Sequence, residues 1–159
     1  MELHLRGVEA SGYLEQLRRL ASMTAPRLTI ATHDPSSPDS MVDLCREYEI
    51  GLALEENALL NRQVCLTNKA FTYILAGLAV VFTDTQGQRP LAEDLGAGAL
   101  LYRSGDHCAL AQGLRRWYQE PARLLEARRA AWAAAVRRWH WEHPAEQGAL
   151  TAAVDRAFS

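Results

Sequence analysis

Apolar residues recur along the chain in two alternating patterns, short runs typical of β-strands and longer segments with helical spacing. The run AVVFTD at 79–84 is the most apolar, as expected of a strand buried on both faces. The alternation favours an α/β domain with a mostly parallel sheet of about five strands. The expected strands are Leu3–Gly7, Arg27–His33, Glu49–Glu55, Ala79–Asp84 and Gly98–Arg103.

Helical spacing fills most of the chain between and after these strands. Leu14, Leu17 and Ala21 form the apolar face of the first expected helix. Thr67 is a suitable N-cap for the third, and Gly77 a suitable stop. The stretch 56–66 has a mixed pattern and is expected to be a connection. The expected helices cover 11–23, 41–48, 68–76, 106–118, 121–139 and 144–158.

Length and composition are those of one globular domain spanning residues 1–159. The net charge of −2 gives no electrostatic footprint for nucleic acid, so we expect no nucleic-acid partner. The sequence contains neither an apolar run long enough to span a bilayer nor a secretory signal, which favours a cytoplasmic location. Its three cysteines are scattered without a CxxC pair, so we expect reduced, buried thiols and no metal site.

Polar residues follow several of the expected strands. In open parallel sheets, ligands bind outside the carboxyl ends of the strands, so these residues are the first candidates for a site. The expected strand ends are Arg6-Gly7, His33-Asp34-Pro35, Leu54-Glu55-Glu56 and Thr83-Asp84-Thr85. Because adjacent residues of a strand point to opposite sides, at most one of the two glutamates faces such a site. We favour Glu55 as the ligand contact and expect Glu56 to be solvated.

A lysine in the first turn of the helix beginning at Asn68 opposes the helix dipole. A helix N-terminus attracts phosphate, and Lys69 would then add to the attraction. Asn68 and Thr72 lie one turn apart, so both side chains can meet the same ligand. The spacing alone favours the simpler interpretation, a Lys69 that is merely solvated in an exposed turn.

The segment "YEIGLALEENALLNRQVCLTNKAFTYILAGLAVVFTDTQGQRPLA" resembles the donor-binding half of GT-B-type glycosyltransferases of the group 1 kind. The resemblance continues through "GAGALLYRSGDHCALAQGL" and "RRWHWEHPAEQGAL", and covers nearly the whole chain. It implies a Rossmann-like three-layer α/β/α fold that binds a UDP-, GDP- or ADP-sugar, without a further cofactor, for transfer with retention of configuration. A flavodoxin- or receiver-like domain also fits the alternation, but the chain lacks the acidic cluster of a phospho-acceptor site.

The resemblance also assigns site residues, although it points to no catalytic residue. The start of the helix at Asn68 would lie at the diphosphate, and the loop after His33 would flank the base. His33 fits equally well as a satisfied loop histidine. The expected nucleotide-sugar-binding residues are Gly7, His33, Pro35, Glu55, Asn61, Asn68, Lys69 and Thr72.

Three departures from the family pattern qualify this function. Thr72 stands where many relatives have a glutamate that binds the ribose, and Pro90 stands where an acidic residue is common. The acceptor-binding half and the usual first strand, which lies mid-sheet in the family, are absent, so the chain looks N-terminally truncated. We therefore expect either that the neighbouring strands close up or that a partner, an acceptor-binding subunit or a second copy, supplies the missing strand. The domain would then be inactive alone; the alternative is a non-catalytic interaction or regulatory fragment.

Some remaining residues have simpler interpretations. We expect His4, His107, His140 and His143 to be surface or capping residues. Trp139 and Trp141 are expected to pack the C-terminal helices onto the sheet. The paired arginines at 115–116, 128–129 and 137–138 fit a solvated face, with peripheral contact to an anionic membrane as the alternative.

Overall fold

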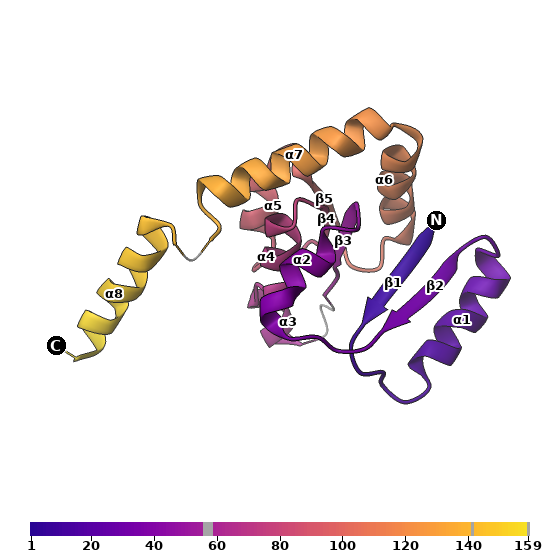
Figure 1. Ribbon diagram of the computed structural model, residues 1–159, viewed down its shortest axis with the longest axis horizontal. Helices are drawn as coiled ribbons and strands as arrows, with labels where there is room; N and C mark the ends of the chain where they lie inside the picture. Colours follow the sequence, from indigo (N-terminus) through magenta and orange to yellow (C-terminus); the bar gives the residue numbers. More distant parts are fainter. Residues whose placement is uncertain (56–58, 141, 159) are drawn as a thin grey trace. The chain divides into compact units, whose positions relative to one another are not determined.

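All five expected strands are present in the structure, a computed structural model that describes residues 1–55, 59–140 and 142–158 (Figure 1). The α/β class is therefore confirmed, with strand boundaries shifted by at most two residues. The strands are β1 (Glu2–Arg6), β2 (Thr29–His33), β3 (Ile50–Ala53), β4 (Ala79–Thr83) and β5 (Ala99–Tyr102).

The strands are parallel, but they form two sheets rather than one. β1 pairs with β2 in a register that sets Leu3 opposite Ile30. The second sheet has the order β3-β4-β5, with Gly51 opposite Val80 and Val81 opposite Leu100. β1 and β3, the strands that the family pattern sets on either side of its first strand, thus belong to different sheets. Among the described residues these two strands do not pair in one sheet, as the closing-up alternative requires.

The chain's contacts divide it into two compact units, Met1–Met41 and Val42–Ser159. The first unit holds β1, β2, helix α1 (Tyr13–Thr24) and the short turn η1 (Pro38–Ser40). The expected face of α1 is confirmed, because Leu14, Leu17 and Ala21 are its half-buried residues. None of residues 1–41 is fully buried, so this unit contributes no core of its own.

The second unit contains the hydrophobic core, which is centred on β4, where every residue is buried. Val80 and Phe82 face one apolar cluster, formed with helices α4 (Asn68–Leu75), α5 (Arg89–Leu95) and α7 (Pro121–Arg137). Ala79 and Val81 face a second cluster that includes Trp117 of α6 (His107–Gln119). Alternate residues of β4 therefore face helices on opposite sides, which gives the expected three layers.

Sequence patterns missed two helices and overextended another. α3 (Leu60–Val64) lies in the stretch expected to be a connection, and α5 was not anticipated. For α5 the signals were present, with Pro90 in the first turn and Gly96 at positive φ after the last residue. α2 (Met41–Cys45) ends before Tyr48, because residues 46–48 turn instead of continuing the helix. The turn η2 (Gly96–Gly98) joins α5 to β5.

The C-terminal helices follow the prediction closely. α7 ends at Arg137, two residues early, and α8 (Pro144–Phe158) has the predicted bounds. Trp139 packs against the core beside Phe71, as expected, and its indole N–H donates to Asp94. The prediction for Trp141 lies outside the described residues.

The cysteines are free thiols, as predicted, but not all are buried. Cys45 is buried, Cys65 is half-buried and Cys108 is exposed, which corrects the expectation for the last two. No helix in the part of the chain that the structure describes is long and apolar enough to cross a membrane.

Candidate functional site

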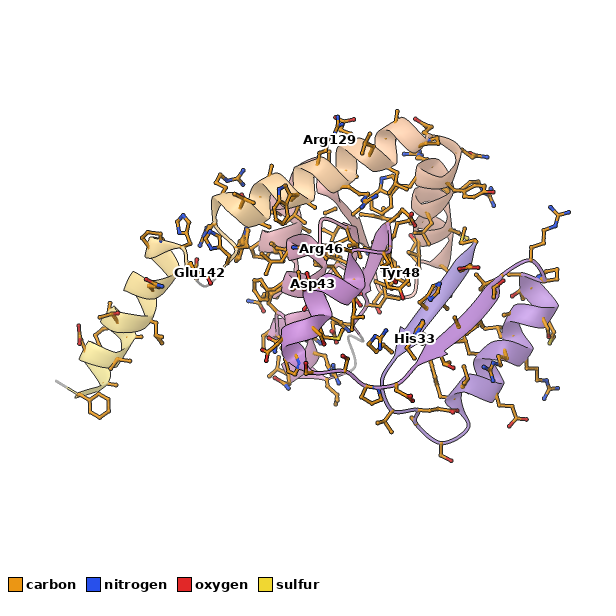
Figure 2. The ribbon with its side chains drawn as sticks, viewed as in Figure 1. His33, Asp43, Arg46, Tyr48, Arg129 and Glu142 are labelled. Carbon is orange, nitrogen blue, oxygen red and sulfur yellow. The ribbon has the colours of Figure 1, made fainter. Side chains whose placement is uncertain are left out.

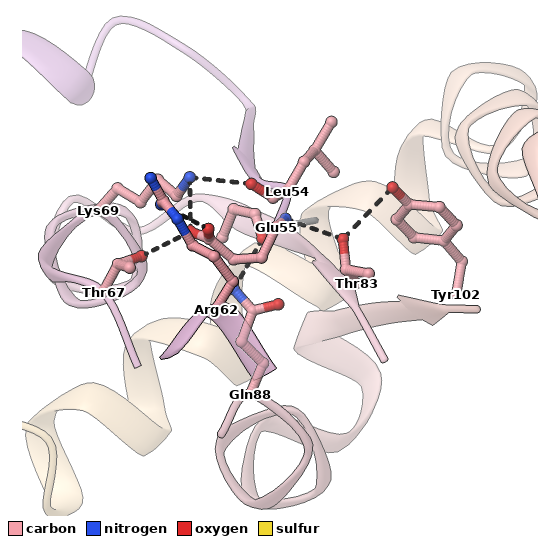
Figure 3. Close-up of polar contacts among 9 residues, drawn as sticks. Leu54, Glu55, Arg62, Thr67, Lys69, Thr83, Gln88 and Tyr102 are labelled. Carbon is pink, nitrogen blue, oxygen red and sulfur yellow. Dashed lines mark hydrogen bonds and ion pairs between the residues drawn. The ribbon is translucent and has the colours of Figure 1, made fainter. Parts of the chain in front are cut away.

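Glu55 follows β3 at the carboxyl end of the three-stranded sheet and carries the most heavily bonded side chain there (Figure 3). Its side chain is only 2% exposed. The ammonium Nζ of Lys69 lies 2.8 Å from Oε1, and Arg62 donates from Nη1 to Oε2 over 2.9 Å. Thr67 donates its hydroxyl to Oε1 over 3.2 Å. The carboxylate therefore holds together α3, the start of α4 and the end of β3.

The backbone around Glu55 is fixed as firmly as its side chain. Its N–H donates to Thr83 Oγ1 over 3.0 Å, and the Thr83 hydroxyl donates to Tyr102 Oη over 3.4 Å. These bonds connect the ends of β3, β4 and β5 (Figure 3). The buried amide of Gln88 donates to Ala53 O over 2.8 Å, while its Oε1 accepts from no described residue. A bonded polar layer thus closes this end of the sheet.

Lys69 lies in the first turn of α4, with its side chain 36% exposed. Besides the ion pair, its ammonium donates to Leu54 O over 3.0 Å. It is the only lysine among the 17 lysine and arginine residues. The compact ammonium matches a place between one carboxylate and one carbonyl better than a planar guanidinium would. Its charge, which opposes the helix dipole, is thus compensated by Glu55.

Burial raises the pKa of Glu55, but its donors outweigh that effect. Hydrogen bonding and charge from Lys69, followed by the bonds from Arg62 and Thr67, hold the pKa of Glu55 below its ordinary value. The carboxylate is therefore ionised at neutral pH, and the Lys69–Glu55 contact is a true ion pair.

The sequence was compared with models of protein families, and one model matches. The model described as "Glycosyl transferase-like" matches residues 4–148, nearly the whole chain. The chain belongs to this glycosyltransferase-like family. The resemblance drawn from the sequence motifs is thereby confirmed at the level of the family. Neither the comparison with curated proteins nor that with solved structures found a match.

Five of the predicted residues of this glycosyltransferase-like domain lie in its second unit. The structure brings Glu55 and Lys69 together, but not Asn61, Asn68 or Thr72. Asn61, in α3, and Asn68, the first residue of α4, have exposed side chains. Thr72 donates its hydroxyl to the backbone oxygen of Asn68 over 3.1 Å. The Thr72 oxygen therefore remains available as an acceptor, while its proton is engaged.

Thr67 differs from its expected role, and Glu55 has partners within the chain that the sequence did not predict. Thr67 occupies the N-cap position of α4, but its hydroxyl makes no capping bond and instead bonds Glu55. The oxygens of Glu55 accept from donors of the chain, and its contact with a ligand stays a prediction. The companion prediction for Glu56 lies outside the described residues.

The remaining predicted residues lie in the first unit of the domain. Gly7 follows β1 at φ 137°, a conformation that favours glycine, and donates its N–H to His33 O over 3.1 Å. His33 ends β2, and its Nε2 lies 2.9 Å from Nδ1 of His4, with the two rings stacked. His4 is therefore a half-buried partner of His33, which corrects its assignment as a surface or capping residue. Pro35 is exposed in the loop before η1.

His140 and His143 were also expected to be surface or capping residues, and the structure differs between them. His143 accepts the N–H of Ala145 at the start of α8 over 3.2 Å, as expected of a capping residue. His140 is half-buried, and its ring meets that of His143 edge-on. Over the described residues, no group of three or more histidine, cysteine, aspartate or glutamate side chains could hold a metal ion.

Sequence reasoning missed Arg62 and Gln88, which organise the site, and gave Thr83 only as one of several residues at strand ends. Arg62 lies in the stretch whose mixed pattern gave no helix, so its position beside Glu55 could not be anticipated. Thr83 ends a buried strand, and its alternation with Phe82 directs it away from the cluster that Phe82 faces. Gln88 stands in the D-T-x-G-Q motif quoted for the family, and that motif was its available signal.

Proposed function

We propose that this domain binds the nucleoside diphosphate sugar for a retaining glycosyltransferase, with the diphosphate at Lys69 and the first turn of α4. The observation that carries the proposal is Lys69 itself. It is the chain's only lysine, it lies at a helix N-terminus, and it is held at the carboxyl end of β3. This combination of cation, free helix N–H groups and strand end suits an anionic ligand.

The diphosphate would share the ammonium of Lys69 with Glu55. Because Glu55 retains the bonds from Arg62 and Thr67, it stays satisfied when Lys69 turns toward a phosphate. The backbone N–H groups of Asn68 and Lys69, the first two of α4, would then donate to the same phosphate. Thr72 would accept one ribose hydroxyl, without the charge that a glutamate would provide. We therefore expect weak nucleotide binding.

Glycosyl transfer by this domain would require a second wall to hold the acceptor. We propose that a separate acceptor-binding subunit or a second copy of the chain provides it. The edge position of β3 supports association, since among the described residues β3 pairs with β4 alone. An edge strand with open backbone groups is a template for a further strand. The domain alone would bind the donor without turning it over.

The first test is calorimetric titration of the purified chain with UDP, GDP and ADP, using Lys69→Ala as the variant. We expect saturable binding of one nucleotide and its loss in the variant, because a charge-assisted contact contributes about 1.5–3 kcal/mol. Arg115→Ala, which removes an exposed cation on α6, is the matched control and should bind as the wild type does.

The single lysine allows an independent readout. Amine-specific reagents can modify only Lys69 and the chain's α-amino group, and mass spectrometry of peptides separates the two sites. A nucleotide bound at α4 should protect Lys69 and leave labelling of the α-amino group unchanged. Equal labelling of Lys69 with and without saturating nucleotide would contradict the proposed site.

The second candidate function is a non-catalytic interaction or regulatory module. The observation that favours it is the ion pair itself, because Glu55 already compensates the charge of Lys69. This candidate predicts no nucleotide binding below the millimolar range by wild type or variant. The same titration therefore decides between the two functions.

A further inference from the structure

Helix α7 has an unusual distribution of side-chain size. Its buried positions are all alanines: Ala127, Ala131, Ala134 and Ala135. Large apolar residues lie on the solvent side, where Leu125 and Trp132 are each 46% exposed and Val136 is 53% exposed. Spacings of seven and four residues place the three on one side of the helix. These side chains contribute little to the chain's own core, so their burial requires something outside it.

The same side of α7 carries positive charge that the chain does not neutralise. Arg129 is exposed between Leu125 and Trp132, and within the described ranges neither it nor Arg128 forms an ion pair. Arg128 instead donates from Nε to Gly77 O over 3.0 Å, at the end of α4. The other arginines of α7 and its C-cap are paired with carboxylates of the chain: Arg123, Arg137 and Arg138.

A hollow of about 420 Å³ lies beside these residues, between α7 and the end of α4. Arg46 and Arg128 line it together with Arg129, and Leu75 and Trp132 supply apolar walls. No acidic residue is among the lining residues, although Asp43 pairs with Arg46 at 2.9 Å. Figure 2 labels Arg129 on α7 and the pair Arg46 and Asp43 at α2. The hollow is thus basic with apolar sides.

We propose that this outer face of α7, formed by Leu125, Arg129, Trp132, Val136 and the hollow, docks on the surface of a bilayer containing anionic phospholipid. Tryptophan and exposed aliphatic side chains enter the boundary between headgroups and acyl chains, while arginines remain at the phosphates. The hollow would receive a lipid phosphate between Arg46 and Arg129.

A bilayer fits this face better than a protein partner does. The face offers three apolar side chains in one row on one helix. Each side of a stable protein interface typically contributes roughly 20–30 residues, so this face falls well short. Attraction to an anionic bilayer does not need a large apolar interface, because each arginine near the bilayer surface raises the affinity about fivefold. The contact would be reversible and sensitive to salt.

Co-sedimentation of the full chain with phospholipid vesicles tests the proposal. We expect binding to vesicles that contain phosphatidylglycerol, little binding to phosphatidylcholine alone, and release as salt is raised. Arg129→Glu should weaken binding by about tenfold or more, since it removes one favourable charge and adds a repulsive one. Trp132→Ser should weaken it as well. Arg115→Glu, at an exposed position of α6, makes the same change in net charge and should have a much smaller effect.

Each other result would overturn the proposal. The proposal is wrong if the wild-type chain does not sediment with anionic vesicles. It is also wrong if Arg129→Glu and Arg115→Glu lose vesicle binding equally, because equal losses would indicate unspecific charge attraction. Light scattering of the same proteins measures their oligomeric state and so tests whether a second copy of the chain occupies this face. A dimer that dissociates in Trp132→Ser would show that this face binds protein instead. Thermal melting confirms that the variants fold, as expected for exposed positions.

Discussion

At the scale of single residues, Glu55 and Lys69 define the candidate site, and each explains the other. A buried carboxylate is costly unless it is paired and hydrogen-bonded, and Glu55 has three donors from two helical segments and the N-cap between them. A lysine in a first helical turn is unfavourable unless an anion is near, and Glu55 is that anion. The Lys69–Glu55 ion pair is consequently a structural contact, and it also keeps the Lys69 ammonium at the carboxyl end of β3.

Glu55→Gln is expected to lower the free energy of unfolding at neutral pH by about 1–3 kcal/mol, because hydrogen bonds to a charged group are lost. The wild-type protein should also lose stability in acid. Since the folded-state pKa of Glu55 is lowered, its contribution is present above the ordinary value of 4.5 and is lost as the pH falls through the folded-state pKa. Urea denaturation at a series of pH values measures both effects.

The matched control for this prediction is Glu93→Gln, which changes an exposed carboxyl on α5. It should leave the acid dependence of unfolding as in the wild type. An acid dependence that is the same in Glu55→Gln and in the wild type would contradict the role assigned to the Glu55 ion pair.

At the scale of elements, the sequence predicted the strands and the long helices but not the short helices or the pairing of side chains at the site. Continuous apolar runs and helical spacing identify β4 and α7, because burial requires them locally. α3 has no such pattern, since none of its residues is fully buried. Arg62 reaches Glu55 only because α3 folds as it does, and a contact of that kind depends on the tertiary structure rather than on local spacing.

The approach of α7 to η2 depends on the absence of a side chain at Gly98. A Cβ there would lie 2.6 Å from the backbone nitrogen of Ala131 and 3.0 Å from Ala127 O. Gly98→Ala should therefore push α7 from the sheet and cost about 1–3 kcal/mol, as overpacking of a core does. For a chain of this size the melting temperature should fall by about 2–4 °C per kcal/mol.

Gly148→Ala is the control for that substitution. Gly148 lies in α8, and a Cβ there would meet no atom within 4 Å. Alanine is the better helix former by about 1 kcal/mol, so the melting temperature should stay level or rise. Equal melting temperatures for Gly98→Ala and the wild type would show that α7 is not packed as closely as described.

At the scale of the whole molecule, burial is distributed unequally between the two units. All of β4 is buried in the second unit, whereas none of residues 1–41 is fully buried in the first. Stability against local opening follows burial, so the two sheets should open at different free energies. The sequence resemblance left open whether the strands would form one sheet, because pairing between strands depends on the tertiary structure.

Amide hydrogen exchange should separate the sheets. The central amides of β4 should exchange at least about 100-fold more slowly than those of β1 and β2, because β4 opens only with the core. Exchange followed by NMR or by mass spectrometry of peptides provides the comparison, with intrinsic rates as the reference. Similar protection of both sheets would mean that the first unit is stabilised as strongly as the core.

The ion pair between Lys69 and Glu55 also determines which anions can reach the lysine. Because the two side chains are tethered in one chain, Glu55 acts as a competing anion with an effective concentration of about millimolar or more. Small free anions at lower concentrations lose that competition. A ligand displaces the carboxylate only when it adds contacts that Glu55 cannot make, such as bonds to the first N–H groups of α4. The site would thus ignore dilute orthophosphate or acetate and respond to a diphosphate bearing a larger recognised group.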